Sequence, residues 1–548
     1  MPIILALFLL QAAQASISGR VVRRGSDTPV PRAQLVLTKV QSQVTDLRTV
    51  TADENGKFSI PNLAPGQYRL FAEREGFLRA EYSQRLNVGG TQELKDIVLP
   101  MTPTGVIAGR VRDADGRAVR NAVVRALRPA YREGIRNLDS VQTTETSDLG
   151  EYRLFGLPPG LYFVSALPAP GPRIEGDVYV VPVIPTRENG NTRERRTPGN
   201  TAIADGIVDP SVFDRETFLT IYYPGTTDAA AAAAIDLQPG ATVSGVDLGT
   251  APSRTVNVRG KVSDGRTGQP ADKASITITQ RGQNGISRSG QAAGGRFDIS
   301  EIVPGSYEVM AQTTVPEIIR ARLPIEVGDR DVENISLILQ PGFPITGRFT
   351  VEGPVSGDNP QAVSPYVQLQ PPNGLGGGYS VPARDGTITV PNVNPGDYRL
   401  RVRPVPPSWY IKSAVFEGTD VLNAGLHVET QSRTSLDIVM SANGATLEAQ
   451  VLDSERRHAQ GVTVALVPDP SRRHRYDLYK SAATDASGRV RLQGIAPGEY
   501  KAFAWTNIVA DSWQDPGIIR VFESRGEPVH FDEGAQRSVT LNVIGTPQ

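Results

Sequence analysis

The sequence contains no cysteine, and this absence excludes disulfide bonds, cysteine nucleophiles and thiolate zinc sites. Tryptophan is scarce, with three residues in 548. The 57 basic and 58 acidic residues leave a formal net charge of -1, so no overall field attracts nucleic acid or acidic membranes. After the N-terminus, no apolar run reaches the roughly 18 residues of a transmembrane helix. We therefore expect no nucleic-acid partner and no transmembrane segment in the mature chain.

The first fifteen residues predict an export signal. An apolar run from Ile3 to Leu10 is followed by Ala13-Gln14-Ala15, a small-residue cleavage site. Because no Lys or Arg precedes the run, a buried first strand is the alternative. We expect residues 1–15 to be a signal peptide and the mature protein to be exported, to the periplasm, the cell surface or the medium.

Glycine and proline are abundant, at 54 and 43 residues, and many of them belong to a motif that occurs five times. It reads glycine, any residue, apolar, any, apolar, two of any kind, apolar, any, then Pro-Gly-any-Tyr. This order predicts a strand, a bend that turns an apolar residue inward, and a type II Pro-Gly turn into a second strand. The copies are Gly56 to Tyr68, Gly150 to Tyr162, Gly295 to Tyr307, Gly386 to Tyr398 and Gly488 to Tyr500.

Each copy lies between an opening strand, such as Ile17-Ser-Gly-Arg-Val21, and a valine-rich closing strand, such as Val539 to Val543. About seven short strands per copy predict a sandwich, and a period near one hundred residues predicts independent domains. The predicted fold is therefore all-β, a tandem array of about five Ig-like or transthyretin-like antiparallel β-sandwiches. Their expected bounds are 16–102, 103–252, 253–341, 342–442 and 443–548.

The order Gly-Arg-Val, turn, Ala-x-Val-x-Leu, Thr-Asp-x-x-Gly-x-Phe, Leu-x-Pro-Gly-x-Tyr resembles the carboxypeptidase regulatory-like domain. Gly109 to Ala166 and Gly19 to Ala72 carry it best. The resemblance implies a transthyretin-like sandwich, often grouped with carbohydrate-binding-like folds, and an exported protein. It implies no single activity, because such modules are accessory units of surface proteins, peptidases and receptors.

The second unit contains a long insertion at about 168–235. It lacks sustained alternation, so we interpret it as an excursion from that sandwich rather than a separate domain. The alanine run from Ala229 to Ala234 is expected to form a short helix capped by Thr227 or Asp228.

Few residues have the spacing of a catalytic or metal site. His530-Phe-Asp-Glu533 matches the short part of a zinc carboxypeptidase motif, but no histidine follows it, and there is no Gly-x-Ser-x-Gly elbow. Asp113-Ala-Asp-Gly116 is better explained as a turn than as a calcium loop. The basic clusters Arg456 to His458 and Arg472 to Arg475 are either solvated loops or a patch for an anionic partner. We expect no enzyme, metal or cofactor.

The large aromatic residues gather in the last two units. Trp409, Tyr410, Trp505 and Trp513 are the candidate ligand-binding residues, as an exposed platform for sugar rings or a protein. The alternative is that they pack in the core. Strand alternation places Trp505 opposite the inward-facing Tyr500, where it is either available to a ligand or covered by the loop that carries Trp513.

Three functions fit these observations. The first is an exported, non-catalytic binding or scaffold protein of a bacterial envelope, with polysaccharide as the ligand to test first. The second is an accessory protein of a larger outer-membrane or surface assembly, with envelope proteins as partners. The third is a remnant or partner of a metallocarboxypeptidase.

Overall fold

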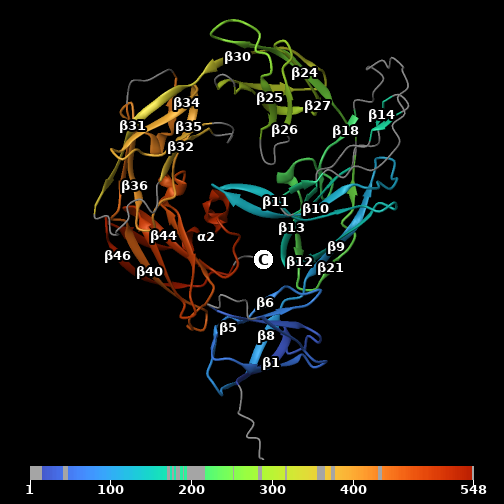
Figure 1. The fold of residues 1–548 in the computed structure, drawn as a ribbon, viewed down its shortest axis with the longest axis vertical. Helices are drawn as coiled ribbons and strands as arrows, with labels where there is room; N and C mark the ends of the chain where they lie inside the picture. Colours follow the sequence, from blue (N-terminus) through green and yellow to red (C-terminus); the bar gives the residue numbers. More distant parts are fainter. Residues whose placement is uncertain are drawn as a thin grey trace, which may run out of the picture. The chain divides into compact units, whose positions relative to one another are not determined.

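The computed structural model describes residues 15–40, 47–168, 216–250, 252–281, 287–314, 318–353, 365–371, 377–429 and 435–545, with four short strands between 173 and 193. The fold is all-β and consists of tandem β-sandwiches, as the sequence predicted (Figure 1). The chain divides into two compact units, Met1–Arg128 with Asp139–Val208 and Phe218–Pro252, and Pro129–Leu138 with Asp209–Thr217 and Ser253–Gln548. The five finer boundaries stay a prediction, and so does the export signal, since residues 1–14 lie outside the described residues.

The first two sandwiches each pair an outer sheet with a sheet that carries the tyrosine strand. The first contains β4 (Lys57–Leu63), β1 (Ala15–Arg23) and β8 (Glu93–Met101), facing β3 (Leu47–Thr51), β2 (Gln34–Lys39), β5 (Gly66–Glu73), β6 (Ala80–Glu81) and β7 (Leu86–Val88). The second contains β12 (Glu151–Leu157), β9 (Gly105–Arg112), β21 (Thr242–Val243) and β22 (Leu248–Gly249), facing β11 (Ile135–Glu145), β10 (Val123–Arg132), β13 (Gly160–Leu167), β19 (Ile221–Tyr222) and β20 (Ile235–Leu237).

The third and fourth sandwiches differ in how their sheets connect. The third is one seven-stranded sheet in the order β26 (Ser287–Gln291), β25 (Ser275–Gln280), β28 (Gly305–Thr313), β29 (Ile319–Val327), β30 (Val332–Pro341), β24 (Val256–Asp264) and β27 (Arg296–Ile302). The fourth has β34 (Thr387–Val393), β31 (Phe343–Glu352), β39 (Leu436–Ser441), β36 (Tyr410–Phe416) and β37 (Thr419–Asp420), facing β33 (Gly378–Ser380), β32 (Tyr366–Gln370), β35 (Gly396–Arg403) and β38 (Leu426–Val428).

The fifth sandwich has a three-stranded and a four-stranded sheet. The first is β43 (Arg489–Ile495), β40 (Ala445–Leu452) and β46 (Gln536–Asn542), and the second is β42 (Lys480–Ala483), β41 (Thr463–Pro468), β44 (Gly498–Trp505) and β45 (Glu527–Phe531). Helices are short, as expected: α1 (Val421–Ala424) and α2 (Pro516–Phe522) are the α-helices of the described chain. Within those same residues, no helix has the length and apolar character to cross a bilayer.

The sheets are mixed, which differs from the antiparallel sandwiches that we predicted. The opening strand pairs in parallel with the closing strand in every sandwich, for example β1 with β8 and β40 with β46. The opening glycine permits this close approach, because a Cβ atom on Gly19 would lie 1.9 Å from the carbonyl oxygen of Ile97. In the fifth sandwich Ala449 takes that position opposite Val539.

The repeated motif forms the same corner five times. Its first strand ends in a register shift, where one residue has a left-handed φ between 55° and 71°. The next apolar residue, Leu63 in the first copy, turns into the core as predicted. The tyrosine hydroxyl then donates a hydrogen bond of 2.6 to 2.9 Å to the carbonyl oxygen four residues earlier. The pairs are Tyr68 with Ala64, Tyr162 with Pro158, Tyr307 with Val303, Tyr398 with Asn394 and Tyr500 with Ala496.

The turn glycine has a positive φ, but the turn is not type II. The five glycines lie between φ 135° and 154°, whereas a type II turn needs about 80°. Glycine alone enters this mirror image of the strand region at low cost. The glycine therefore begins the next strand, and the bulge and the tyrosine bond set the bend.

Much of the insertion predicted at 168–235 lies outside the described residues. The insertion ends earlier in the sequence than predicted. Ile221 and Ile235 belong to the core of the second sandwich, and β19 pairs with β13, so the chain has rejoined the sandwich by residue 221. The alanine run contains a single 3-10 turn, Ala229–Ala231, and the Asp228 carboxylate caps it by accepting a hydrogen bond from the Ala230 N–H.

Candidate binding groove of the fifth sandwich

The candidate aromatic residues do not form an exposed platform, which corrects that hypothesis. Trp505 is 0% exposed, Trp513 3% and Tyr410 6%, while Trp409 is half-buried against the core of the fourth sandwich. Tyr410 belongs to the core cluster of the fifth sandwich although it lies in β36. Tyr410, Trp505 and Trp513 therefore pack in cores, as the alternative interpretation of the sequence proposed, and Trp409 packs half-buried against one.

Trp505 points away from the inner core, as the alternation predicted, but a second apolar cluster covers it. The segment between β44 and β45 folds back over the outer face of the sheet and brings Trp513, Ile519 and Phe522 onto the ring. Trp505 stacks on Trp513 with 6.2 Å between ring centroids, and Phe522 meets it edge-on at 5.5 Å. The covering segment includes α2, labelled beside β44 in Figure 1.

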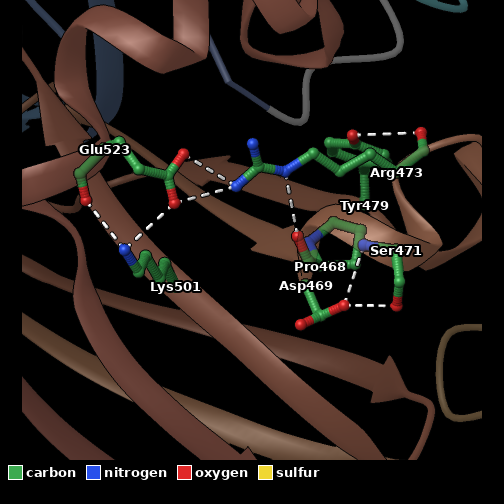
Figure 2. A network of polar contacts seen from close by, with 7 residues as sticks. All are labelled: Pro468, Asp469, Ser471, Arg473, Tyr479, Lys501 and Glu523. Atoms are coloured by element: carbon green, nitrogen blue, oxygen red, sulfur yellow. Dashed lines mark hydrogen bonds and ion pairs between the residues drawn. The ribbon is translucent and has the colours of Figure 1, made fainter.

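A polar network fastens this covering segment to the sheet (Figure 2). Arg473 donates to both carboxylate oxygens of Glu523 at 3.0 and 2.8 Å, and Lys501 lies 3.0 Å from the same carboxylate. Burial alone would raise the pKa of the Glu523 carboxyl, but the hydrogen bonds from Lys501 and Arg473 outweigh burial and lower the pKa. The segment is thus held by charge-assisted bonds as well as by apolar packing.

The basic cluster Arg472 to Arg475 is consequently not a free patch for an anionic partner. Besides Arg473, Arg475 pairs with Asp477 at 2.7 Å, and its side chain is 8% exposed. Arg472 donates to the carbonyl oxygen of Pro497 and lies over the Tyr500 ring. These arginines serve the fold of the fifth sandwich.

The motif from His530 to Glu533 does not assemble a metal site. His530 lies in β45, where its Nδ1 is 2.6 Å from Glu499, whereas Glu533 accepts a hydrogen bond from Ser441 at 2.6 Å. The two potential ligands therefore have different partners. Among the residues that the structure describes, no group of three His, Asp or Glu side chains could hold a metal ion. Asp113 caps a turn through the N–H groups of Asp115 and Arg117, as expected.

The fifth sandwich has a groove of about 220 Å³ at its side. It is bordered by Ala502 and Ala504 of β44, whose own side chains are buried, and by residues 540–544, from β46 to Ile544, on the other side. Arg525 and Glu527 stand at the mouth, both exposed. Neither makes an ion pair within the described part of the chain, so the groove has two available charges at its mouth.

The groove exists because the tyrosine strand has small residues here. Two residues after the motif tyrosine, the other sandwiches carry Leu70, Val164, Val309 and Leu400, whereas the fifth carries Ala502. The side chain that would fill this end of the core is thus reduced to a methyl group. The sequence analysis did not predict the groove, although the contrast is visible when the five copies of the motif are compared.

Comparisons with known proteins agree with the family that the motifs resemble. The model of the carboxypeptidase regulatory-like domain matches residues 16–100. No curated protein matches the chain. Solved structures that it resembles include a streptococcal ancillary pilin (12% identity, 60% of this chain, 99% of the pilin, TM-score 0.22) and the major pilin subunit of Bacillus cereus (11%, 80%, 99%, 0.15). Those scores are too low to carry an argument about this chain. Residues 16–100 are therefore similar to the carboxypeptidase regulatory-like domain.

Proposed function

We propose that this protein is an exported, non-catalytic scaffold of β-sandwiches that binds envelope proteins through its fifth sandwich. The groove beside β46 carries the proposal, because it joins a depression, available charges and a sheet edge. The repeated residues of the motif also act in the fold: the tyrosine bonds the bend and the glycine starts the strand.

Polysaccharide is the less favoured ligand. The aromatic rings that would stack on sugars are buried by Trp513 and the helix α2. A groove of about 220 Å³ is also smaller than the roughly 300 to 1,000 Å³ of small-molecule sites. A protein side chain fits the dimensions better than a sugar chain.

Two assays on the full chain test the proposal. The immobilised protein is exposed to envelope proteins, and each captured protein is purified and titrated against the chain; a glycan array is probed in parallel. We expect saturable binding of at least one envelope protein and no glycan signal. Binding to glycans alone would favour the carbohydrate function, and hydrolysis of peptides by the purified protein would contradict a non-catalytic role.

A further inference from the structure

In the fourth sandwich a strand occupies the sheet edge that has no neighbouring strand in the fifth. Its strand β36 lies along β39 as an antiparallel neighbour, with pairs such as Ser413–Val439 and Val415–Asp437. Ile411, Ala414 and Phe416 of β36 are buried in the core of that sandwich. β36 therefore closes the side of the fourth sandwich with one row of hydrogen bonds and three apolar side chains.

β46 is the counterpart of β39 in the fifth sandwich. Leu436 of β39 pairs with Gly347, and Val539 of β46 pairs with Ala449, the equivalent residue of the opening strand. Thr540 and Asn542 thus correspond to Asp437 and Val439, the residues that β36 pairs. Within the described chain, β46 is the last strand of its sheet and has no such neighbour.

The edge of β46 has no neighbouring strand because the connection between β44 and β45 takes a different path. In the fourth sandwich, the chain after β35 forms β36, which pairs with β39. In the fifth, the chain after β44 crosses the outer face of the sheet instead and buries Trp505. The residues after β46 cross to the other sheet, where the N–H of Ile544 donates a hydrogen bond of 2.7 Å to the carbonyl oxygen of Ala504 in β44. That contact closes one end of the side and leaves the groove beside residues 540–543.

Main-chain N–H and C=O groups of β46 face the groove. The N–H of Val543 bonds to Leu452 of β40. Because main-chain groups point alternately to the two sides of a strand, those of Thr540 and Asn542 face away from β40. A row of unpaired N–H and C=O groups at a sheet edge is a template for one more strand.

We infer that this edge accepts an extended segment of a partner protein, which adds antiparallel to β46 and places side chains into the groove that Ala502 and Ala504 border. The inference rests on the proposed binding function and names its partner chemistry. β36 shows which segment fits: its inward residues are an isoleucine, an alanine and a phenylalanine. A cavity of about 150 Å³ already holds a benzene ring, so 220 Å³ takes a phenylalanine ring and a smaller group.

The charges at the mouth match a polypeptide partner. Arg525 and Glu527 are exposed, opposite in sign and two residues apart beside the groove. An incoming strand that carries a carboxylate and an amine near one end can pair with both, while Ser538, Thr540 and Asn542 offer it neutral outward neighbours. Main-chain bonds would supply affinity and the groove would select the side chains.

The test uses the full chain and a fluorescent peptide with the sequence of residues 409–418, which contains β36. Fluorescence anisotropy should show saturable binding. Ala502→Leu, which restores the side chain of Leu400, should abolish binding. Thr540→Pro, which removes an N–H from the free edge and leaves the β40 ladder intact, should weaken it about tenfold or more. The matched control Thr540→Val keeps the N–H and should bind as the wild type does.

Each outcome decides the inference. A peptide with Asp in place of its Ile and Phe should not bind. No binding of the original peptide, or binding that survives both Ala502→Leu and Thr540→Pro, would overturn the strand-acceptor role, because insertion into the fourth sandwich would be indifferent to these changes. A purified envelope partner that still binds both variants would leave the scaffold function standing and this inference wrong.

Discussion

The hydroxyl of Tyr500 donates a hydrogen bond of 2.9 Å to the carbonyl oxygen of Ala496, across the Pro-Gly bend that joins β43 to β44. Burial raises the pKa of Tyr500 to about 12, so the hydroxyl remains protonated and keeps this role across the physiological range. The same pair of positions is bonded in all five sandwiches, and it makes the tyrosine of the motif a structural residue.

Tyr500→Phe should lower the stability of the fifth sandwich by about 1 to 3 kcal/mol, because a buried carbonyl loses its donor. Denaturant unfolding followed by tryptophan fluorescence reports on this sandwich, since it contains Trp505 and Trp513. The control is Tyr379→Phe, where the ring is 67% exposed and no loss is expected. Equal stability of Tyr500→Phe and wild type would show that the corner does not depend on this bond.

Trp513→Ala should destabilise the fifth sandwich by about 3 to 5 kcal/mol, because it opens a cavity over Trp505 and Phe522. In the wild type, acrylamide should quench half-buried Trp409 and leave the other two tryptophans shielded. Strong quenching of all three, with a stable Trp513→Ala variant, would restore the exposed platform and the sugar hypothesis.

Gly305→Ala should cost the third sandwich about 1 to 3 kcal/mol, because φ at this position is 154° and a Cβ atom is strained there. Hydrogen exchange of β27 and β28 measures the loss locally. Gly328→Ala is the control in the same sandwich, since that glycine lacks a positive φ and a Cβ would meet no atom within 4 Å. Identical exchange in both variants would contradict the strain.

The fifth sandwich should lose some stability as the pH rises through the raised pKa of His530. The hydrogen bond to Glu499 raises that pKa, so the imidazolium is favoured in the folded state. Its contribution is fully present below the unfolded value of about 6.5 and disappears above the folded value. Glu499→Gln should remove the larger part of this dependence in unfolding midpoints measured between pH about 5 and 9, since Asp532 makes the smaller contribution. A slope that persists undiminished in Glu499→Gln would assign it to another group.

The sequence by itself determined the repeated unit. Spacing within the motif was sufficient to place the bend, the inward residue such as Leu63 and the start of the tyrosine strand, because each depends on local backbone preferences and on alternation. The all-β class and the tandem sandwiches followed from five copies of that motif. The parallel pairing of β1 with β8 did not, since pairing joins strands distant in sequence.

Only the tertiary structure determined that the aromatic rings are buried and where the groove lies. Alternation placed Trp505 on the outer face, but only the path of residues 506–526 determined that the face is covered. The same path left β46 without the neighbour that β36 gives to β39. A segment that connects two strands can follow several paths with a similar loss of chain entropy. Long-range contacts, such as that of Arg473 with Glu523, determine which path it follows.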